Sequence, residues 1–204
     1  MDIVYTLGIS SLWDEVCHMP VGGVWWLNVD RYADAVSLMN QTLESQAQDS
    51  KVAAIVMGKN PNEVMSLKKD RGPNKIALFT MPDRPEGLRE LHRDLLCSME
   101  PGNYLFILLC TENSWQNIKT EELLRWVEKS NRWAKYHNCS LMILNSANDT
   151  DKQLSPLLRQ YRALSGLASI RYQGDSHLFD ISWWGSEKGI SAQQQLVILH
   201  DDEG

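Results

Sequence analysis

The sequence lacks the features that would place it in or across a membrane. Its longest apolar run, Tyr104 to Cys110, is much shorter than the about 20 residues that a membrane-spanning helix needs. Met1 to Ser10 contains an acidic Asp2 and has neither the basic start nor the apolar centre of a signal peptide. We therefore expect a cytoplasmic chain that reaches a membrane only through a partner.

Positive charge and paired cysteines are also scarce. The 204 residues include 20 Lys and Arg against 26 Asp and Glu, and the basic residues are scattered singly, so nucleic acid is not an expected partner. The four cysteines form no CxxC pair and no zinc-binding spacing, which predicts reduced thiols: Cys17, Cys97, Cys110 and Cys139. With 43% hydrophobic residues, residues 1–204 can bury one core as a single domain.

What the sequence does contain is an alternation of strand-like and helix-like segments. Apolar runs of strand length alternate with segments whose apolar residues recur at helical spacing, which is typical of βαβ units and a parallel sheet. The strands are expected at 21–30, 51–57, 75–80, 104–110 and 141–145, and the helices at 36–47, 88–99, 120–137 and 154–166, the last ending at Gly166. Turn residues after position 168 predict an antiparallel meander. The predicted fold is α/β, with a parallel core sheet extended at one edge by two or three antiparallel strands.

The place where such a sheet binds ligands has the wrong residues for phosphate. A nucleotide site needs a glycine-rich loop after a strand, with backbone N–H groups around the phosphates. The first predicted strand is followed instead by Asp30 and Asp34, whose charges repel phosphate. We expect Asp30 to cap the next helix and Asp34 to complement its dipole. The alternative is a nucleotide-binding enzyme with an unorthodox phosphate loop, in which Glu112 or Asp30 is the acid.

Other catalytic and ligand motifs are incomplete. The segment Gly8 to Leu12 lacks the second glycine of a nucleophile elbow, and the five histidines show no metal-ligand spacing. Arg171 to Asp175 (RYQGD) is one residue too long for the R-x-G-D motif that binds cyclic-di-GMP, and a turn explains its Gly-Asp pair. We expect no catalytic residue, no metal and no cofactor in this chain.

Tryptophan is abundant, with eight residues, and one of them is a candidate interface anchor. Strand alternation in 177–184 puts Phe179, Ile181 and Trp183 on one face and leaves Trp184 with polar neighbours on the other. The candidate protein-interaction residues are therefore Asp180, Ser182 and Trp184. The alternative is that Trp184 is covered by a helix or loop of its own chain.

Four segments together resemble the BcsE family of accessory regulators of bacterial cellulose secretion. They are residues 7–43 (LGISSLWDEVCHMPVGGVWWLNVDRYADAVSLMNQTL), 104–110 (YLFILLC), 140–145 (SLMILN) and 166–184 (GLASIRYQGDSHLFDISWW), and the likeness covers essentially the whole chain. It implies the N-terminal domain of a longer protein, whose cyclic-di-GMP site lies in receiver-like and diguanylate-cyclase-like domains beyond this chain. It also implies a degenerate P-loop, RecA-like three-layer sandwich without ATPase activity.

The same resemblance implies the partners. They are a second copy of the chain, the small single-span membrane peptide BcsF, and the cytosolic proteins BcsR and BcsQ, so that the domain is recruited to the inner membrane through a partner. Arg171 and Asp175 depart from the family's ligand motif and are given no role in cyclic-di-GMP binding. The expected function is a non-catalytic regulatory and scaffold domain, with the nucleotide-binding enzyme as the alternative.

Overall fold

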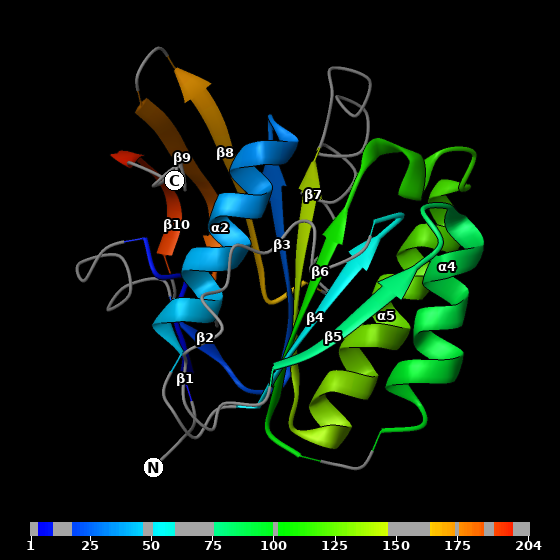
Figure 1. Cartoon of the computed structure of the whole chain (residues 1–204). Helices are drawn as coiled ribbons and strands as arrows, with labels where there is room; N and C mark the ends of the chain where they lie inside the picture. The colour runs from blue at the N-terminus through cyan, green and yellow to red at the C-terminus, as the bar shows by residue number, and fades with distance from the viewer. Residues whose placement is uncertain are drawn as a thin grey trace.

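A mostly parallel sheet flanked by helices forms the protein (Figure 1). The computed structural model describes residues 4–9, 18–46, 51–59, 76–99, 102–146, 164–173, 176–185 and 190–197. The eight strands of the main sheet are ordered β10-β9-β8-β3-β7-β6-β4-β5. The parallel strands are β3 (Gly23–Val29), β4 (Lys51–Met57), β5 (Ile76–Met81), β6 (Tyr104–Cys110), β7 (Ser140–Ser146) and β8 (Gly166–Gln173). A separate two-stranded sheet joins β1 (Val4–Tyr5) to β2 (Met19–Pro20).

The five predicted parallel strands are confirmed, and the chain adds a sixth. We expected the segment after residue 168 to be antiparallel throughout, but β8 runs parallel to β3, with Leu27 opposite Ala168. Only β9 (Ser176–Trp184) and β10 (Ile190–Val197) are antiparallel, so the predicted extension of one edge has two strands. Local residue patterns give strands but not their neighbours, which explains the error.

Gly166 was expected to end a helix and instead begins β8. A Cβ atom at this position would lie 2.6 Å from a ring carbon of Trp25 and 2.9 Å from one of Trp184. Glycine is required here because two indole rings pack directly over the backbone. Residues 154–163 of the expected helix, including Pro156, lie outside the described residues.

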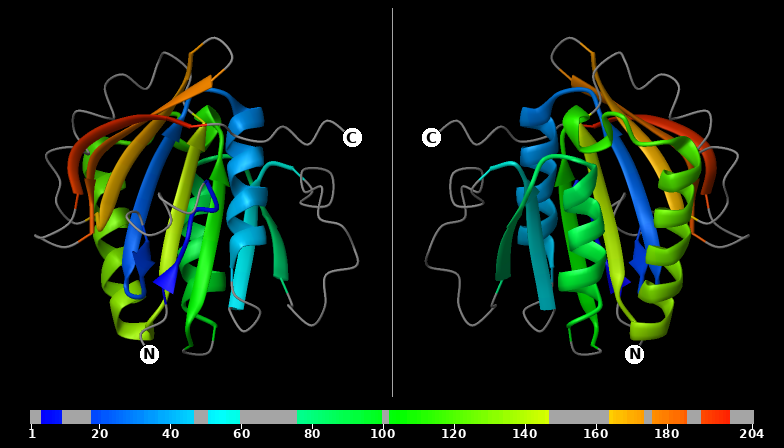
Figure 2. Two further views of the ribbon diagram at one scale, coloured as in Figure 1. Left: turned by 90° about the vertical axis from the view of Figure 1, so that its left-hand side faces the viewer. Right: turned by 90° about the vertical axis from the view of Figure 1, so that its right-hand side faces the viewer.

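Helices cover both faces of the sheet, giving three layers (Figure 2). On one face lies α2 (Tyr32–Ser45), and on the other lie α4 (Pro85–Glu90), the π-helix η1 (Leu91–Leu96) and α5 (Thr120–His137), which has the predicted bounds. A short 3-10 helix, η2 (Glu112–Trp115), follows β6. The predicted solvent-side ion pairs of α5 are present. Nη2 of Arg125 lies 3.9 Å from Oε2 of Glu121, and Nη2 of Arg132 lies 3.5 Å from Oε1 of Glu128. No helix among the described residues is long and apolar enough to cross a membrane.

Strand β3 shows why both faces are covered. Trp25, Leu27 and Val29 pack in the cluster that contains α2, while Val24 and Trp26 pack in the cluster that contains α4, η1 and α5. All five side chains are at most 1% exposed. An apolar residue at almost every position of a central parallel strand buries both of its faces, as predicted.

Candidate functional site

The carboxyl ends of the parallel strands form the candidate site, and the first of its elements is the start of α2. The helix begins at Tyr32 with Arg31 as N-cap, which makes no side-chain capping bond. The prediction that Asp30 is the cap is wrong, because the backbone N–H of Asp30 donates to the carbonyl of Ile170 at 3.1 Å and so extends the β3–β8 pairing by one residue. Asp34 does lie in the first turn, as predicted.

Asp34 is engaged by two partners within the chain. Nε and Nη2 of Arg31 donate to its two carboxylate oxygens at 2.7 and 2.6 Å, and Nε2 of His177 lies 3.2 Å from Oδ2. The side chain of Asp34 is 1% exposed, so this is a buried carboxylate in a forked ion pair. The guanidinium of Arg31 also stacks at 3.6 Å on the ring of Tyr172. The helix start that would hold a phosphate in a nucleotide-binding protein is filled by the protein's own carboxylate.

Sequence reasoning treated Asp34 only as a negative charge and missed its partners. The three-residue spacing of Arg31 and Asp34 places both on one helix face and is a usable signal for their pair. His177 belongs to β9 and reaches Asp34 because β8 pairs with β3 and β9 pairs with β8. No local pattern indicates that contact.

A second carboxylate, Asp83, joins the ends of β4, β5 and β6. Its oxygens accept hydrogen bonds from the hydroxyls of Thr111 at 2.5 Å and Ser114 at 2.6 Å, and from the amide of Asn113 at 3.5 Å. Gly58 ends β4 with φ +71°, and a Cβ atom there would lie 2.5 Å from Cβ of Asp83. Thr111 and Ser114 also form the capping box of η2. Asp83 therefore organises the loops at this edge, a role that the sequence did not indicate.

The carboxylate of Asp83 also affects the ionisation of a neighbouring tyrosine. Burial, then the charges of Asp83 and Cys110, raise the pKa of Tyr32 to about 12. The thiol of Cys110 is fully buried, and this burial raises its pKa well above the ordinary value. Both groups are therefore neutral at physiological pH.

Between these two carboxylates, side-chain amides and indoles form a hydrogen-bonded network at the middle of the edge. Asn28 and Asn145 are opposite one another on β3 and β7, and the amide of Asn145 donates to Oδ1 of Asn28 at 3.0 Å. The indoles of Trp26 and Trp115 donate to Asn28 and Asn145 at 2.9 and 2.7 Å. The donors and acceptors of these four side chains thus bond to one another at the middle of the edge.

The nearby cavity has three acidic and two basic side chains in its lining. It has a volume of about 400 Å³ and is lined by Asp83, Arg84, Pro85, Glu86, Arg89, Asn113, Gln116, Asn117, Ile118 and Glu122. Arg89 is paired with Glu122, and Arg84 lies 3.9 Å from Glu86. Because each arginine has a carboxylate beside it, this cavity carries no excess of positive charge for an anion.

The two acids of the enzyme alternative lie on different strands. Asp30 follows β3, whereas Glu112 begins η2 after β6, and β7 separates these strands in the sheet. Two strand spacings correspond to about 10 Å. The side chain of Glu112 lies outside the described part of the structure, as do Gly174 and Asp175 of the RYQGD segment. Within the described residues no group of three or more His, Cys, Asp or Glu side chains is placed to hold a metal.

The predicted exposure of Trp184 is wrong. The side chain is 2% exposed, its ring centroid lies 4.8 Å from that of Trp25, and its indole donates to the carbonyl of His18 at 3.0 Å. The cause is a β-bulge: Leu167 faces Trp183 while Ala168 faces Ile181, so Ser182 is an extra residue in β9. One inserted residue reverses which side chains of β9 point to each face of the sheet, so Trp184 points into the core. This agrees with the alternative that Trp184 is covered by its own chain.

The other two predicted interaction residues have structural contacts. Asp180 is 19% exposed and accepts a hydrogen bond from Arg171 at 3.0 Å across the β8–β9 pair. Ser182 is the bulged residue itself and is half-buried. These three positions therefore do not form an exposed tryptophan-centred patch.

The free edge at β5 has a different character. None of its six residues, Ile76 to Met81 (IALFTM), is charged or proline, and its pairing with β4 runs without a bulge. Leu78 is 37% exposed, and the other apolar residues are half-buried. Among the described strands none pairs with the outer side of β5. Soluble proteins normally protect such an edge with charge, proline or a covering segment.

Comparison with known proteins gives a consistent result. Residues 1–204 match the family model described as "Cellulose biosynthesis protein BcsE, N-terminal domain". The chain is 71% identical over its whole length to a "Cyclic di-GMP binding protein BcsE" of Klebsiella pneumoniae, of which it covers 40%. Proteins of the same name from Salmonella typhimurium and Escherichia coli (strain K12) are 55% and 54% identical, over 100% and 97% of this chain and 39% and 38% of their own lengths. The chain thus spans about two fifths of these relatives.

Proposed function

The chain belongs to the family of the N-terminal domain of the cellulose biosynthesis protein BcsE, and from this membership we propose that it is a non-catalytic regulatory and scaffold domain. In this role it forms a homodimer and docks other components of a cellulose secretion system. The relatives are named for binding cyclic-di-GMP. Because the chain covers 40% of such a protein, the proposal assigns that ligand to the remainder of the longer proteins.

The observation that carries the non-catalytic part is the buried Arg31–Asp34 pair at the start of α2. In a parallel α/β sheet the end of a strand followed by a helix is the preferred place for a phosphate. Here a carboxylate that is 1% exposed already occupies the first turn of the helix and is held by a forked arginine. Phosphate at this position would meet a negative charge.

The proposal includes descent from a P-loop, RecA-like NTPase. The central unit β3–α2 and the parallel strands on both sides of β3 are compatible with that architecture. The polar groups at the strand ends now hydrogen-bond to one another, as the Asn28–Asn145 and Asp83 networks illustrate. In this proposal, polar groups that would bind a nucleotide in an NTPase instead stabilise the fold by bonding to one another.

The β5 edge is the proposed surface for a second copy of the chain. Two identical edges related by a two-fold axis pair antiparallel, so six uncharged residues from each copy would extend the sheet across the dimer. Pairing would satisfy the outer backbone groups of β5 and cover Leu78, which is 37% exposed. The other proposed partners, BcsF, BcsR and BcsQ, then bind the remaining surfaces, and BcsF links the cytoplasmic domain to the inner membrane.

Calorimetry separates this proposal from the enzyme alternative. The 204-residue chain is titrated with ATP, GTP and cyclic-di-GMP, each with and without magnesium. The proposal expects no saturable heat from any of the three. Saturable binding of a nucleotide in the millimolar range or tighter would support the enzyme alternative instead.

Docking is tested by light scattering of the same chain with and without the BcsF peptide in detergent micelles, against micelles alone. A complex of defined stoichiometry is expected. A chain whose mass is unchanged by the peptide at high micromolar concentration would argue against docking, whatever the nucleotide result.

A further inference from the structure

The helix after α4 contains a π turn that brings a cysteine against a histidine. The backbone N–H of Cys97 donates to the carbonyl of His92 at 3.1 Å, which is the five-residue bond of a π-helix. In a regular α-helix, five residues place two side chains about 140° apart around the axis. The wider π turn reduces this offset, so that the two side chains meet.

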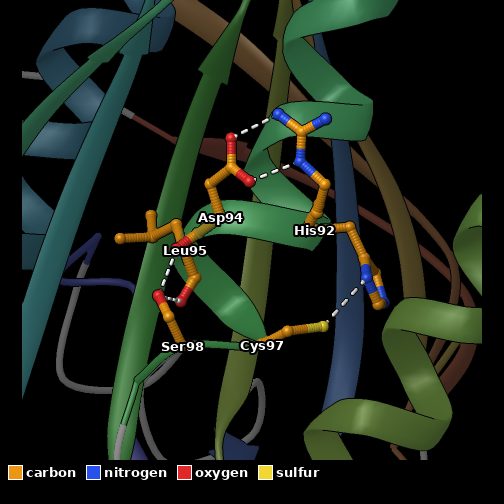
Figure 3. A network of polar contacts seen from close by, with 6 residues as sticks. His92, Asp94, Leu95, Cys97 and Ser98 are labelled. Atoms are coloured by element: carbon orange, nitrogen blue, oxygen red, sulfur yellow. Dashed lines mark hydrogen bonds and ion pairs between the residues drawn. The ribbon is translucent and has the colours of Figure 1, made fainter.

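Figure 3 shows these side chains pointing toward one another, with Sγ of Cys97 at 3.4 Å from Nδ1 of His92. The thiol is exposed to solvent. The histidine is 5% exposed, and its other nitrogen, Nε2, has no hydrogen-bond partner in the described structure. The imidazole is thus held in the protein interior, and Cys97 is the polar group that its Nδ1 faces.

This geometry places a proton acceptor directly beside the thiol, and the deprotonated form of a cysteine is its reactive form. Nδ1 of His92 can take up the thiol proton, or in its N–H form it can donate to the thiolate. Burial, and then the charge of Lys129, lower the pKa of His92, so its ring is neutral and available at pH 7. Lys129 is exposed on α5 and adds a positive charge near the pair. The closest carboxylate in sequence, Asp94, is already bound by Arg93.

The other described cysteines lack this arrangement. Cys110 is fully buried, and Cys139 is 1% exposed, with its thiol donating to the carbonyl of Gly102 at 2.8 Å. Burial raises the pKa of both thiols. Neither can be approached by a reagent in the folded protein.

We propose that Cys97 is a reversible thiol-modification site, activated by His92, whose co-substrate is a low-molecular-weight disulfide. The Cys97 thiolate attacks one sulfur of the disulfide; the new S–S bond forms as the old one breaks, and the second sulfur leaves as a thiolate that takes up the proton. The exchange needs no other oxidant, and a free thiol reverses it. The inference is independent of the proposed scaffold function.

The test measures the reaction of 5,5′-dithiobis(2-nitrobenzoate) with the 204-residue chain from pH 5.5 to 9.5, in a Cys17→Ser background because Cys17 lies outside the described residues. One fast-reacting thiol per folded chain is expected, and Cys97→Ser should remove it. His92→Phe should displace the pH–rate profile to higher pH, and each unit of displacement slows the reaction at pH 7 by about threefold. At pH 9.5, where both thiols are largely ionised, the variant should react at least as fast as the parent chain.

Two further variants test the roles of His92 and Lys129 in the reaction of Cys97. His92→Asn, which keeps a hydrogen-bonding group, should restore part of the rate, and circular dichroism should show every variant folded. Lys129→Gln should slow the reaction of this anionic reagent more than that of neutral iodoacetamide. Superimposable pH–rate profiles for the parent chain and His92→Phe would overturn the proposal. So would a Cys97 that reacts no faster than glutathione at pH 7, or a His92→Phe effect that is equal at every pH.

Discussion

The indole ring of Trp184 is held by one aromatic contact and one hydrogen bond. It packs at 4.8 Å on Trp25, and its indole N–H donates to the carbonyl of His18 at 3.0 Å. Gly166 leaves the space that both rings occupy. A buried aromatic of this size contributes to folding through its removed surface and its packing, and a cavity remains when it is truncated.

Trp184→Ala should therefore lower the free energy of unfolding by about 3–5 kcal/mol. Urea denaturation followed by circular dichroism measures this change. Trp183→Ala is the matched control, because Trp183 is only half-buried on the neighbouring position of the same strand, and it should cost less. A loss below about 1 kcal/mol for Trp184→Ala would contradict the burial described above.

Tyr32 gives a prediction about alkaline pH. Burial raises its pKa to about 12 in the folded protein, whereas a tyrosine in the unfolded chain ionises near its ordinary value of 10.0. The neutral form is favoured by folding, so its contribution is complete below pH 10 and is lost as the pH rises toward 12. Urea denaturation between pH 9 and 11.5 should show a smaller decline in stability for Tyr32→Phe than for the parent chain. Equal declines would exclude a raised pKa for Tyr32.

At the scale of secondary-structure elements, the Arg31–Asp34–His177 contacts tie the start of α2 to the start of β9. The two elements are far apart in the sequence and both lie at the carboxyl edge of the sheet. The pair combines a carboxylate that is 1% exposed with an arginine that is 42% exposed. Removing the arginine would leave a buried charge with less compensation.

Arg31→Ala should destabilise the protein by about 2–3 kcal/mol, less than the about 3–5 kcal/mol of a fully buried pair, because the arginine is partly solvated. Arg132→Ala is the control, since its pair with Glu128 lies on the surface at 73% and 49% exposure and should contribute less than about 1 kcal/mol. The double variant Arg31→Ala/Asp34→Asn should recover part of the loss. Equal unfolding free energies for the two single variants would refute a structural role for the Arg31–Asp34 pair.

The elements also show what a residue pattern can and cannot predict. The apolar stripe and the paired surface charges predict α5 at both ends, and the structure adds that the helix ends at Asn138, a C-cap in the left-handed conformation. The segment 88–99 has an equally good helical stripe, yet it contains the π turn at 91–96. A π turn and the bulge at Ser182 each insert one residue without changing the composition, so alternation and periodicity do not reveal them.

At the scale of the whole molecule, sheet order is the information that local patterns lack. The α/β class and the antiparallel edge follow from the sequence, since buried parallel strands are apolar on both faces. The contacts of Asp34 with His177 and of Asp83 with Thr111 depend on which strands are neighbours. Of the candidate site, the acidic character of the helix start could be predicted, but the Asp83 network and the burial of Trp184 could not.

Association of two chains through the β5 edge is measured most directly by light scattering across a concentration series. The 204-residue chain should reach about twice its monomer mass of 23.3 kDa. Leu78→Lys, which puts a charge on the exposed face of the edge strand, should keep the monomer mass. Tyr136→Lys, at an 83% exposed site on α5, should still dimerise. A parent chain that stays at 23.3 kDa at every concentration, or a Leu78→Lys variant that dimerises equally well, would contradict dimerisation through the β5 edge.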